Sequence, residues 1–195
     1  MIRRAAKGGQ WPKGLGLAVV AACLAAVACS GGEENLSAKA REFKAAALGY
    51  LQRTKAVLPR LEGPGLDQKV DQALRRVFQE AHAKGAPLPC AVAVLDRQGR
   101  VIAGRYPDPQ KPEGETVAKP GQNYSRYQGM RQVLQDGRTM HFPLYDPSGE
   151  LYAVCAPLEQ DGSVRGALCL GFDARTVHQD LGVSAKEFLA LNFNP

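Results

Sequence analysis

Two arginines and two tyrosines in one short segment are the side chains of this sequence best suited to binding an anion. They are Tyr124, Arg126, Tyr127 and Arg131. A guanidinium group presents a planar fork of N–H donors that pairs with a carboxylate, and a tyrosine hydroxyl can add a further hydrogen bond. In the alternative interpretation, Tyr127, Met130 and Leu134 pack a helix against a sheet while both arginines are solvated. The residue types alone leave both interpretations open.

The spacing of cysteine and histidine argues against metal, haem and thiol-redox chemistry. After residue 30 the cysteines are Cys90, Cys155 and Cys169, and none belongs to a Cys-x-x-Cys or haem-attachment motif. The three histidines are far apart and lack metal-ligand spacing. No glycine-rich stretch matches a phosphate-binding loop, and no nucleophile with an adjacent base is evident. We therefore expect a protein that is not an enzyme, holds no metal or cofactor, and packs these cysteines in buried strands.

The first 35 residues have the three parts of a bacterial export signal. Residues 1–13 carry four basic and no acidic side chains, residues 14–28 are apolar, and residues 30–35 are polar. The apolar run is shorter than the roughly 20 residues that a membrane-spanning helix needs. We therefore expect a signal peptide over 1–28, a tether over 29–36 and a single domain over 37–195.

The end of the apolar run, from Leu24 to Cys29, resembles a bacterial lipobox. The match is imperfect because Ala26 stands where that family usually has leucine, and Cys23 offers a competing match with a shorter apolar region. The resemblance implies that Cys29 is lipidated. The protein would then be held on the extracytoplasmic side of the cell envelope, in the periplasm or at the outer membrane, by its lipid anchor.

Removing the expected signal peptide also removes most of the positive charge. The whole chain has a formal net charge of +6, from 25 basic and 19 acidic residues, and the expected mature chain keeps 21 basic residues, for about +2. No basic stretch interleaved with aromatic residues remains. We therefore expect no nucleic-acid partner.

Helical periodicity appears at the start and at the end of the expected domain. An apolar stripe predicts a helix over 37–58, and a second stripe after Asp67, the candidate N-cap, predicts a helix that stops at Gly85. Ser184 and Glu187 form a capping-box pattern before an apolar run, which predicts a terminal helix.

The central part of the sequence changes to the period of strands. It predicts a hairpin of strands 90–95 and 101–104, a long loop over 106–121, a short helix that ends at Asp136-Gly137, and strands over 138–145, 151–158 and 164–172. The expected fold class is α+β, with long N-terminal helices packed on a five-stranded antiparallel sheet.

The two cysteines of the last predicted hairpin raise the question of a disulfide. Cys155 and Cys169 lie on consecutive strands, but a register error of one residue would send their side chains to opposite faces. A disulfide needs Cβ atoms about 3.5–4.5 Å apart. We therefore expect at most one disulfide and favour none.

Two sequence segments carry a family resemblance. Residues 93–103, with Leu95-Asp96 before Gly99 and Val101-Ile102-Ala103 after it, resemble the first hairpin of Cache and PAS-like sensory domains. Residues 151–168, with an Ala-Pro-Leu segment before a Gly-x-Val-x-Gly segment, resemble the last hairpin of that family. The resemblance covers about residues 36–175 and implies a sensory fold rather than a particular chemistry.

The resemblance also implies where a ligand would lie, namely between one sheet face and the loop and helix that precede the last three strands. The implied ligand-binding residues are Tyr124, Arg126, Tyr127, Met130, Arg131 and Asp173. Asp173 could instead cap the helix that follows it. Because two of the six residues are arginines close to a helix N-terminus, the expected ligand is a small anion. The aromatic and acidic motif with which some Cache domains hold amino acids is not evident.

These observations favour a non-enzymatic, lipid-anchored sensory or small-molecule-binding domain outside the cytoplasm. Family members usually continue into a membrane helix after the last strand, whereas this sequence stops at Pro195. We therefore do not expect a direct transmembrane signaller. The alternative is a structural or accessory envelope lipoprotein that docks onto a partner protein and binds no small ligand.

Overall fold

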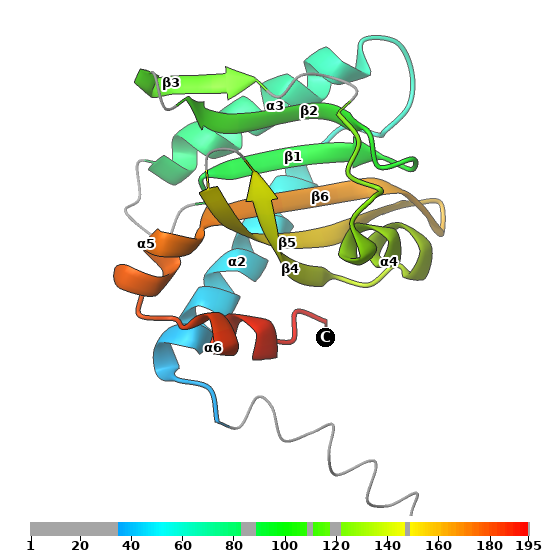
Figure 1. Cartoon of the computed structure of the whole chain (residues 1–195). Helices are drawn as coiled ribbons and strands as arrows, with labels where there is room; N and C mark the ends of the chain where they lie inside the picture. Colours follow the sequence, from blue (N-terminus) through cyan, green and yellow to red (C-terminus); the bar gives the residue numbers. More distant parts are fainter. Residues whose placement is uncertain (1–34, 83–88, 109–110, 118–121, 147–148, 195) are drawn as a thin grey trace, which may run out of the picture. The chain divides into compact units, whose positions relative to one another are not determined.

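A six-stranded antiparallel sheet lies at the centre of the computed structural model (Figure 1). The structure describes residues 35–82, 89–108, 111–117, 122–146 and 149–194. The strands are β1 (Ala91–Asp96), β2 (Val101–Asp108), β3 (Lys111–Val117), β4 (Met140–Asp146), β5 (Gly149–Gln160) and β6 (Ser163–Asp173). Their order across the sheet is β3-β2-β1-β6-β5-β4. Residues Leu36–Pro195 form one compact unit, distinct from Met1–Asn35.

Helices cover both faces of this sheet, which explains why its central strands are apolar on both sides. The helices are α2 (Ala38–Val57), α3 (Leu66–His82), α4 (Gln128–Asp136), α5 (Ala174–Gln179) and α6 (Ala185–Ala190). Helices α2 and α3 lie behind the sheet in Figure 1, and α4 lies in front of it. Val92 and Val94 belong to the core on the α2 side, whereas Ala93 and Leu95 belong to the core beneath α4.

The N-termini of α2 and α6 are joined by one carboxylate. Ser184 and Glu187 form the predicted capping box, and a Glu187 carboxylate oxygen also accepts from the Ser37 backbone N–H at 3.2 Å. Ser37 in turn caps α2. Beneath this junction the ring centroids of Phe43 and Phe188 lie 6.2 Å apart.

The α+β class and the antiparallel sheet are confirmed, but the predicted loop over 106–121 is wrong where the structure describes it. Strand β2 continues to Asp108, and Lys111–Val117 forms the edge strand β3, so the sheet has a sixth strand. Proline in this segment suggested a loop, but an edge strand tolerates proline because one row of its backbone groups needs no partner. The predicted helix stop at Gly85 lies outside the described residues.

The expected signal peptide, the tether as far as residue 34, Cys23 and the candidate lipidation site Cys29 also lie outside the described residues. No helix within the described ranges is long and apolar enough to cross a membrane.

Candidate ligand-binding site

The tip of the first hairpin holds the segment that leads into α4. The Tyr124 N–H donates to the Gly99 carbonyl, and the Val101 N–H donates to the Gln122 carbonyl, each at 2.8 Å. Gly99 has φ +77°, and a Cβ there would lie 3.0 Å from the Ser125 nitrogen. Glycine at this turn therefore allows the segment to approach closely. The hairpin fixes Tyr124 over the sheet.

Beneath this segment lies a cavity of about 50 Å³, called here the inner cavity. Its floor includes four small residues of the central strands, Ala91, Ala93, Ala153 and Gly171. Larger side chains from other elements complete the wall, among them Tyr106, Tyr124, Met130, Phe142 and Leu144. Small side chains at these sheet positions leave space that the larger ones do not fill.

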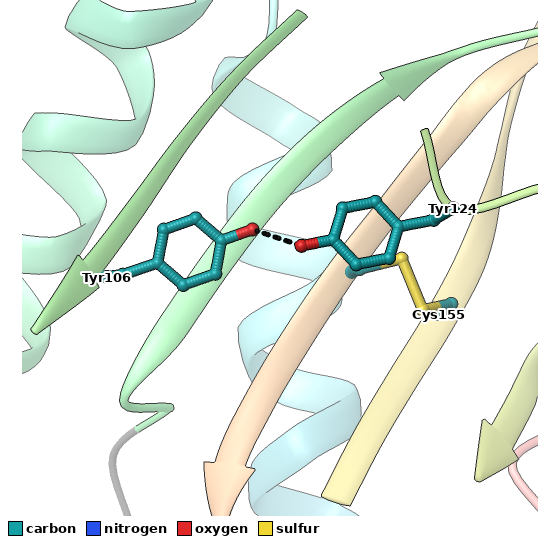
Figure 2. Close-up of a disulfide and its surroundings, with 4 residues drawn as sticks. Tyr106, Tyr124 and Cys155 are labelled. Carbon is teal, nitrogen blue, oxygen red and sulfur yellow. Dashed lines mark hydrogen bonds between the residues drawn. A yellow bond between two sulfur atoms is a disulfide. The ribbon is translucent and has the colours of Figure 1, made fainter. Parts of the chain in front are cut away.

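A disulfide joins Cys155 and Cys169 in the floor of the inner cavity (Figure 2). The two residues are paired directly across β5 and β6, with Cα atoms 4.1 Å apart. The prediction that favoured no disulfide is therefore wrong. The sequence left the register uncertain by one or two residues, and the actual register places both side chains on the same face of the sheet.

Two tyrosines that line the inner cavity bring their hydroxyls together beside it. The oxygens of Tyr106 and Tyr124 lie 3.2 Å apart, within hydrogen-bond distance, and Figure 2 shows the two rings pointing toward each other close to the disulfide. Among the described residues that line the cavity, none carries a charge. The pair is therefore the main polar feature of an otherwise apolar wall.

Stacked aromatic rings support the wall formed by Tyr124. The ring centroids of Tyr124 and Tyr127 lie 6.0 Å apart, and those of Tyr127 and Phe142 lie 6.3 Å apart. A Cβ at Gly129 would overlap the Phe142 ring, so glycine at this position of α4 lets that ring pack beneath the helix. This stack makes Tyr127 a packing residue behind the cavity wall.

The two arginines of the predicted site lie elsewhere, in an exposed depression called here the outer hollow. It is lined by Arg97, Gln98, Ser125, Arg126, Arg131, Leu134 and Gln135. Arg126 donates to the Tyr127 hydroxyl at 3.0 Å, and its guanidinium carbon lies 5.0 Å from the centre of that ring. Arg131 donates to the backbone carbonyl of Arg126 at 3.3 Å. These contacts hold both guanidinium groups on the outer side of the α4 segment.

Asp173 caps α5. Its carboxylate accepts from the Thr176 backbone N–H at 2.7 Å, the alternative that the sequence left open. The six predicted ligand-binding residues are thus divided: Tyr124 and Met130 line the inner cavity, Tyr127 packs behind its wall, the arginines line the outer hollow, and Asp173 caps a helix.

Sequence reasoning missed Tyr106 and the small residues of the cavity floor. Tyr106 fell within the predicted loop, so no facing direction was assigned to it. Ala91 and Ala93 are two positions apart in a predicted strand and must share a face, which was a usable signal. The described ranges contain no group of three side chains able to hold a metal ion.

Comparison with known proteins relates this chain to solved structures but not to a sequence family. No family model and no curated protein matches the sequence. The ligand-binding domain of a chemoreceptor from Campylobacter jejuni in complex with 4-methylisoleucine is similar, with a TM-score of 0.57 and 11% identity over 73% of this chain and 56% of that chain. The same receptor domain in complex with L-valine gives a TM-score of 0.55 and 13% identity over 84% of this chain and 66% of that chain.

A third similar structure is an extracellular ligand-binding receptor from Desulfohalobium retbaense, with a TM-score of 0.52 and 15% identity over 76% of this chain and 26% of that chain. This chain therefore spans less than two thirds of the length of each of the three structures. At these identities the likeness shows the fold alone. The chain from Leu36 onward has the Cache/PAS-like fold found in extracellular sensory domains.

Proposed function

We propose that this protein is a lipid-anchored, extracytoplasmic sensory domain that binds a small molecule in the inner cavity and catalyses no reaction. The observation that carries the proposal is the cavity itself. It lies between the sheet and the α4 segment, the position that the family resemblance assigns to a ligand, and small residues of the floor keep it open. Ligand-binding sites are typically concave and mainly apolar with a few polar groups at fixed positions, and the inner cavity has this character on a smaller scale.

The disulfide supports a location outside the cytoplasm. Cys155 and Cys169 are bonded in the structure, and disulfides persist mainly in oxidising compartments. The basic start, the apolar run and the lipobox-like segment ending at Cys29 agree with export. Two independent parts of the chain thus favour the same location.

The lining of the cavity favours binding over catalysis. It supplies two tyrosine hydroxyls and a disulfide, without a carboxylate or imidazole among its described residues that could act as a general base. A thermal-shift screen of the protein against uncharged and charged metabolites tests the proposal. We expect a subset of compounds to raise the melting temperature, and a screen in which none does would contradict ligand binding.

The anchor is tested separately. Replacing Cys29 by Ala in a native host should abolish lipidation and release the protein from the membrane fraction, because acyl chains contribute about 0.8 kcal/mol per buried CH₂ group. Replacing Cys23 by Ala is the matched control and should leave the fractionation unchanged. A Cys29→Ala protein that still sediments with membranes would show that the anchor is elsewhere.

The outer hollow favours a second candidate function, docking onto an acidic partner protein. Three arginines, Arg97, Arg126 and Arg131, line it, whereas the described lining of the inner cavity includes no cationic side chain. Guanidinium groups pair well with carboxylates.

The position of the outer hollow fits a protein partner better than the membrane. Helix α2 has 20 residues and is therefore about 30 Å long. The chain enters the domain at the N-terminal end of α2. Just beyond the C-terminal end of α2, the Leu61 N–H donates to the Gln160 side chain at the β5–β6 turn. Asp96, which begins the turn carrying Arg97, pairs with Gly166 at that same end of the sheet, so the outer hollow lies toward the end of α2 opposite to the one at which the chain enters.

Photo-crosslinking in the native host tests this second candidate. A crosslinker at position 131 should yield a defined protein adduct that is lost on replacing Arg97 and Arg126 by Glu. A crosslinker at Tyr145, which is exposed on β4, provides the control. Equal labelling at both positions would contradict docking at the outer hollow.

A further inference from the structure

We infer that the inner cavity takes a small uncharged molecule, mainly apolar and carrying one oxygen atom, rather than an amino acid. The inference rests on the proposed function and names the ligand class of its site. Three features of the cavity carry it: the absence of charge in the described lining, its volume, and the position of its hydroxyl pair.

The first feature is the apolar character of the lining. An amino acid carries an ammonium and a carboxylate group, and burying either without a charged or hydrogen-bonding partner is strongly unfavourable. The described lining has no acidic or basic side chain, and Arg126 and Arg131 line the outer hollow instead. The chemoreceptor domains with this fold were solved with L-valine and 4-methylisoleucine. The described part of the lining has no charged side chain to balance the charges of such ligands.

The second feature is size. The cavity has about 50 Å³ of free space. One water molecule needs roughly 10–15 Å³ by a comparable measure. The space therefore suits a molecule of about three to five non-hydrogen atoms. Short-chain ketones and alcohols fall in this range.

The third feature is the polar anchor. A tyrosine hydroxyl can both donate and accept a hydrogen bond. The Tyr106 and Tyr124 oxygens, 3.2 Å apart, come from β2 and from the segment before α4, so a ligand oxygen placed beside the pair, within hydrogen-bond distance of both, would contact both elements. The rest of the ligand would lie against Ala93, Ala153 and Met130. The pair thus selects an oxygen-bearing group and fixes its orientation.

Methyl NMR of the protein tests this inference directly. The sequence has three methionines, of which Met130 lines the cavity and is 2% exposed, while Met140 packs nearby without lining it. With methionine methyl groups labelled with carbon-13, the probes are butan-2-one, butyrate and L-valine. We expect butan-2-one to shift the Met130 signal saturably, with weak affinity because so few atoms make contact. Butyrate and L-valine should not shift it.

Conservative variants then test the polar anchor. Tyr124→Phe should raise the butan-2-one concentration needed for half-saturation about two- to tenfold, the effect of losing one neutral hydrogen bond. Tyr106→Phe should do the same. Tyr145→Phe, at a hydroxyl outside the cavity lining, should leave the titration unchanged. Equal half-saturation in all four proteins would overturn the role of the pair.

The other outcomes separate the inference from the proposed function. A saturable Met130 shift with L-valine or butyrate would contradict the inferred ligand class but would still support a ligand-binding function. No shift with any probe would overturn the inference. In that case a thermal-shift hit from the larger screen would still support the proposed function. A screen without any hit would contradict both the inference and the proposed function.

Discussion

Arg105 on β2 donates from a single Nη2 atom to both carboxylate oxygens of Asp71 on α3, at 2.5 and 2.6 Å. The Arg105 side chain is only 3% exposed, whereas that of Asp71 is 27% exposed. A buried charge depends on its partner far more than an exposed one does. The pair therefore fixes α3 to the strand that also carries Tyr106.

Replacing Asp71 by Ala should lower the free energy of unfolding by about 3–5 kcal/mol, because it leaves the buried Arg105 charge without its carboxylate. Urea denaturation measures the change. Glu42→Ala, at an exposed position of α2, is the control and should stay within about 0.5 kcal/mol of the parent. A loss below about 1 kcal/mol for Asp71→Ala would show that the ion pair contributes little.

The disulfide should stabilise the domain in the same assay. The bond spans 14 positions, and closing a loop of that size is worth about 3 kcal/mol in the chain-entropy model. Replacing both Cys155 and Cys169 by Ala should lower the free energy of unfolding by about that amount. Cys90→Ala should lower it by less because Cys90 is outside the disulfide. Peptide mass mapping that found Cys155 and Cys169 as thiols in the protein isolated from its native host would contradict the bond.

Acid should weaken the junction of α2 and α6 through Glu187. Hydrogen bonds from Ser184, followed by those from Ser37, lower the pKa of the Glu187 carboxyl from 4.5 to about 2. A carboxyl with a lowered folded-state pKa stabilises the fold above its unfolded value, so this contribution is lost as the pH falls from about 4.5 toward 2. Melting temperatures across this range measure it.

The matched variant for that junction is Glu187→Gln, which removes the titrating group and keeps the side-chain shape. Its melting temperature should be below that of the parent at pH 7, and the difference should shrink as the pH falls below 4.5. Glu42→Gln should follow the parent throughout. A constant difference between Glu187→Gln and the parent would contradict the linkage.

His141 should add a second pH dependence nearer neutrality. Burial lowers its pKa below 6.5, partly offset by its hydrogen bond with the Leu189 carbonyl, and its ring lies 5.2 Å from those of Phe188 and Phe193. A histidine with a lowered folded-state pKa takes up a proton on unfolding, so stability should decrease as the pH falls below about 6.5.

Urea titrations at pH 7.5 and 5.5 test this effect. The loss of stability between the two values should be smaller in His141→Gln than in the parent protein, because the variant has no ring to protonate. His178→Gln, on the exposed side of α5, is the control and should retain the parental loss. An unchanged loss in His141→Gln would assign the pH dependence to another group.

Much of the fold could be predicted because local and tertiary signals agree. The Ser184–Glu187 capping box opens α6, and Gly137 ends α4 in the left-handed conformation, both as the sequence indicated. Edge strand β3 was not predictable in the same way. Only one of its sides pairs with the sheet, and Lys111–Val117 lacks the apolar alternation that marks a half-buried strand.

The candidate ligand site was harder to predict because it depends on orientation. The sequence places Arg126 and Arg131 near Tyr124, but only the packing of α4 and of the segment before it decides that the tyrosine lines the inner cavity and the arginines the outer hollow. The disulfide depended on a strand register that periodicity fixes only to within a residue or two. Both features arise from tertiary packing rather than from local sequence.

Filling the inner cavity tests the central claim most directly. Ala153, in the cavity floor, is replaced by Leu, and Ala190, at the exposed end of α6, is replaced by Leu as the control. Calorimetry then measures the affinity of each folded variant for the best compound of the thermal-shift screen. If the inner cavity is the binding site, Ala153→Leu should weaken binding more than tenfold and Ala190→Leu should bind as the parent does. A folded Ala153→Leu protein with the parental affinity would contradict the claim that the ligand binds in the inner cavity.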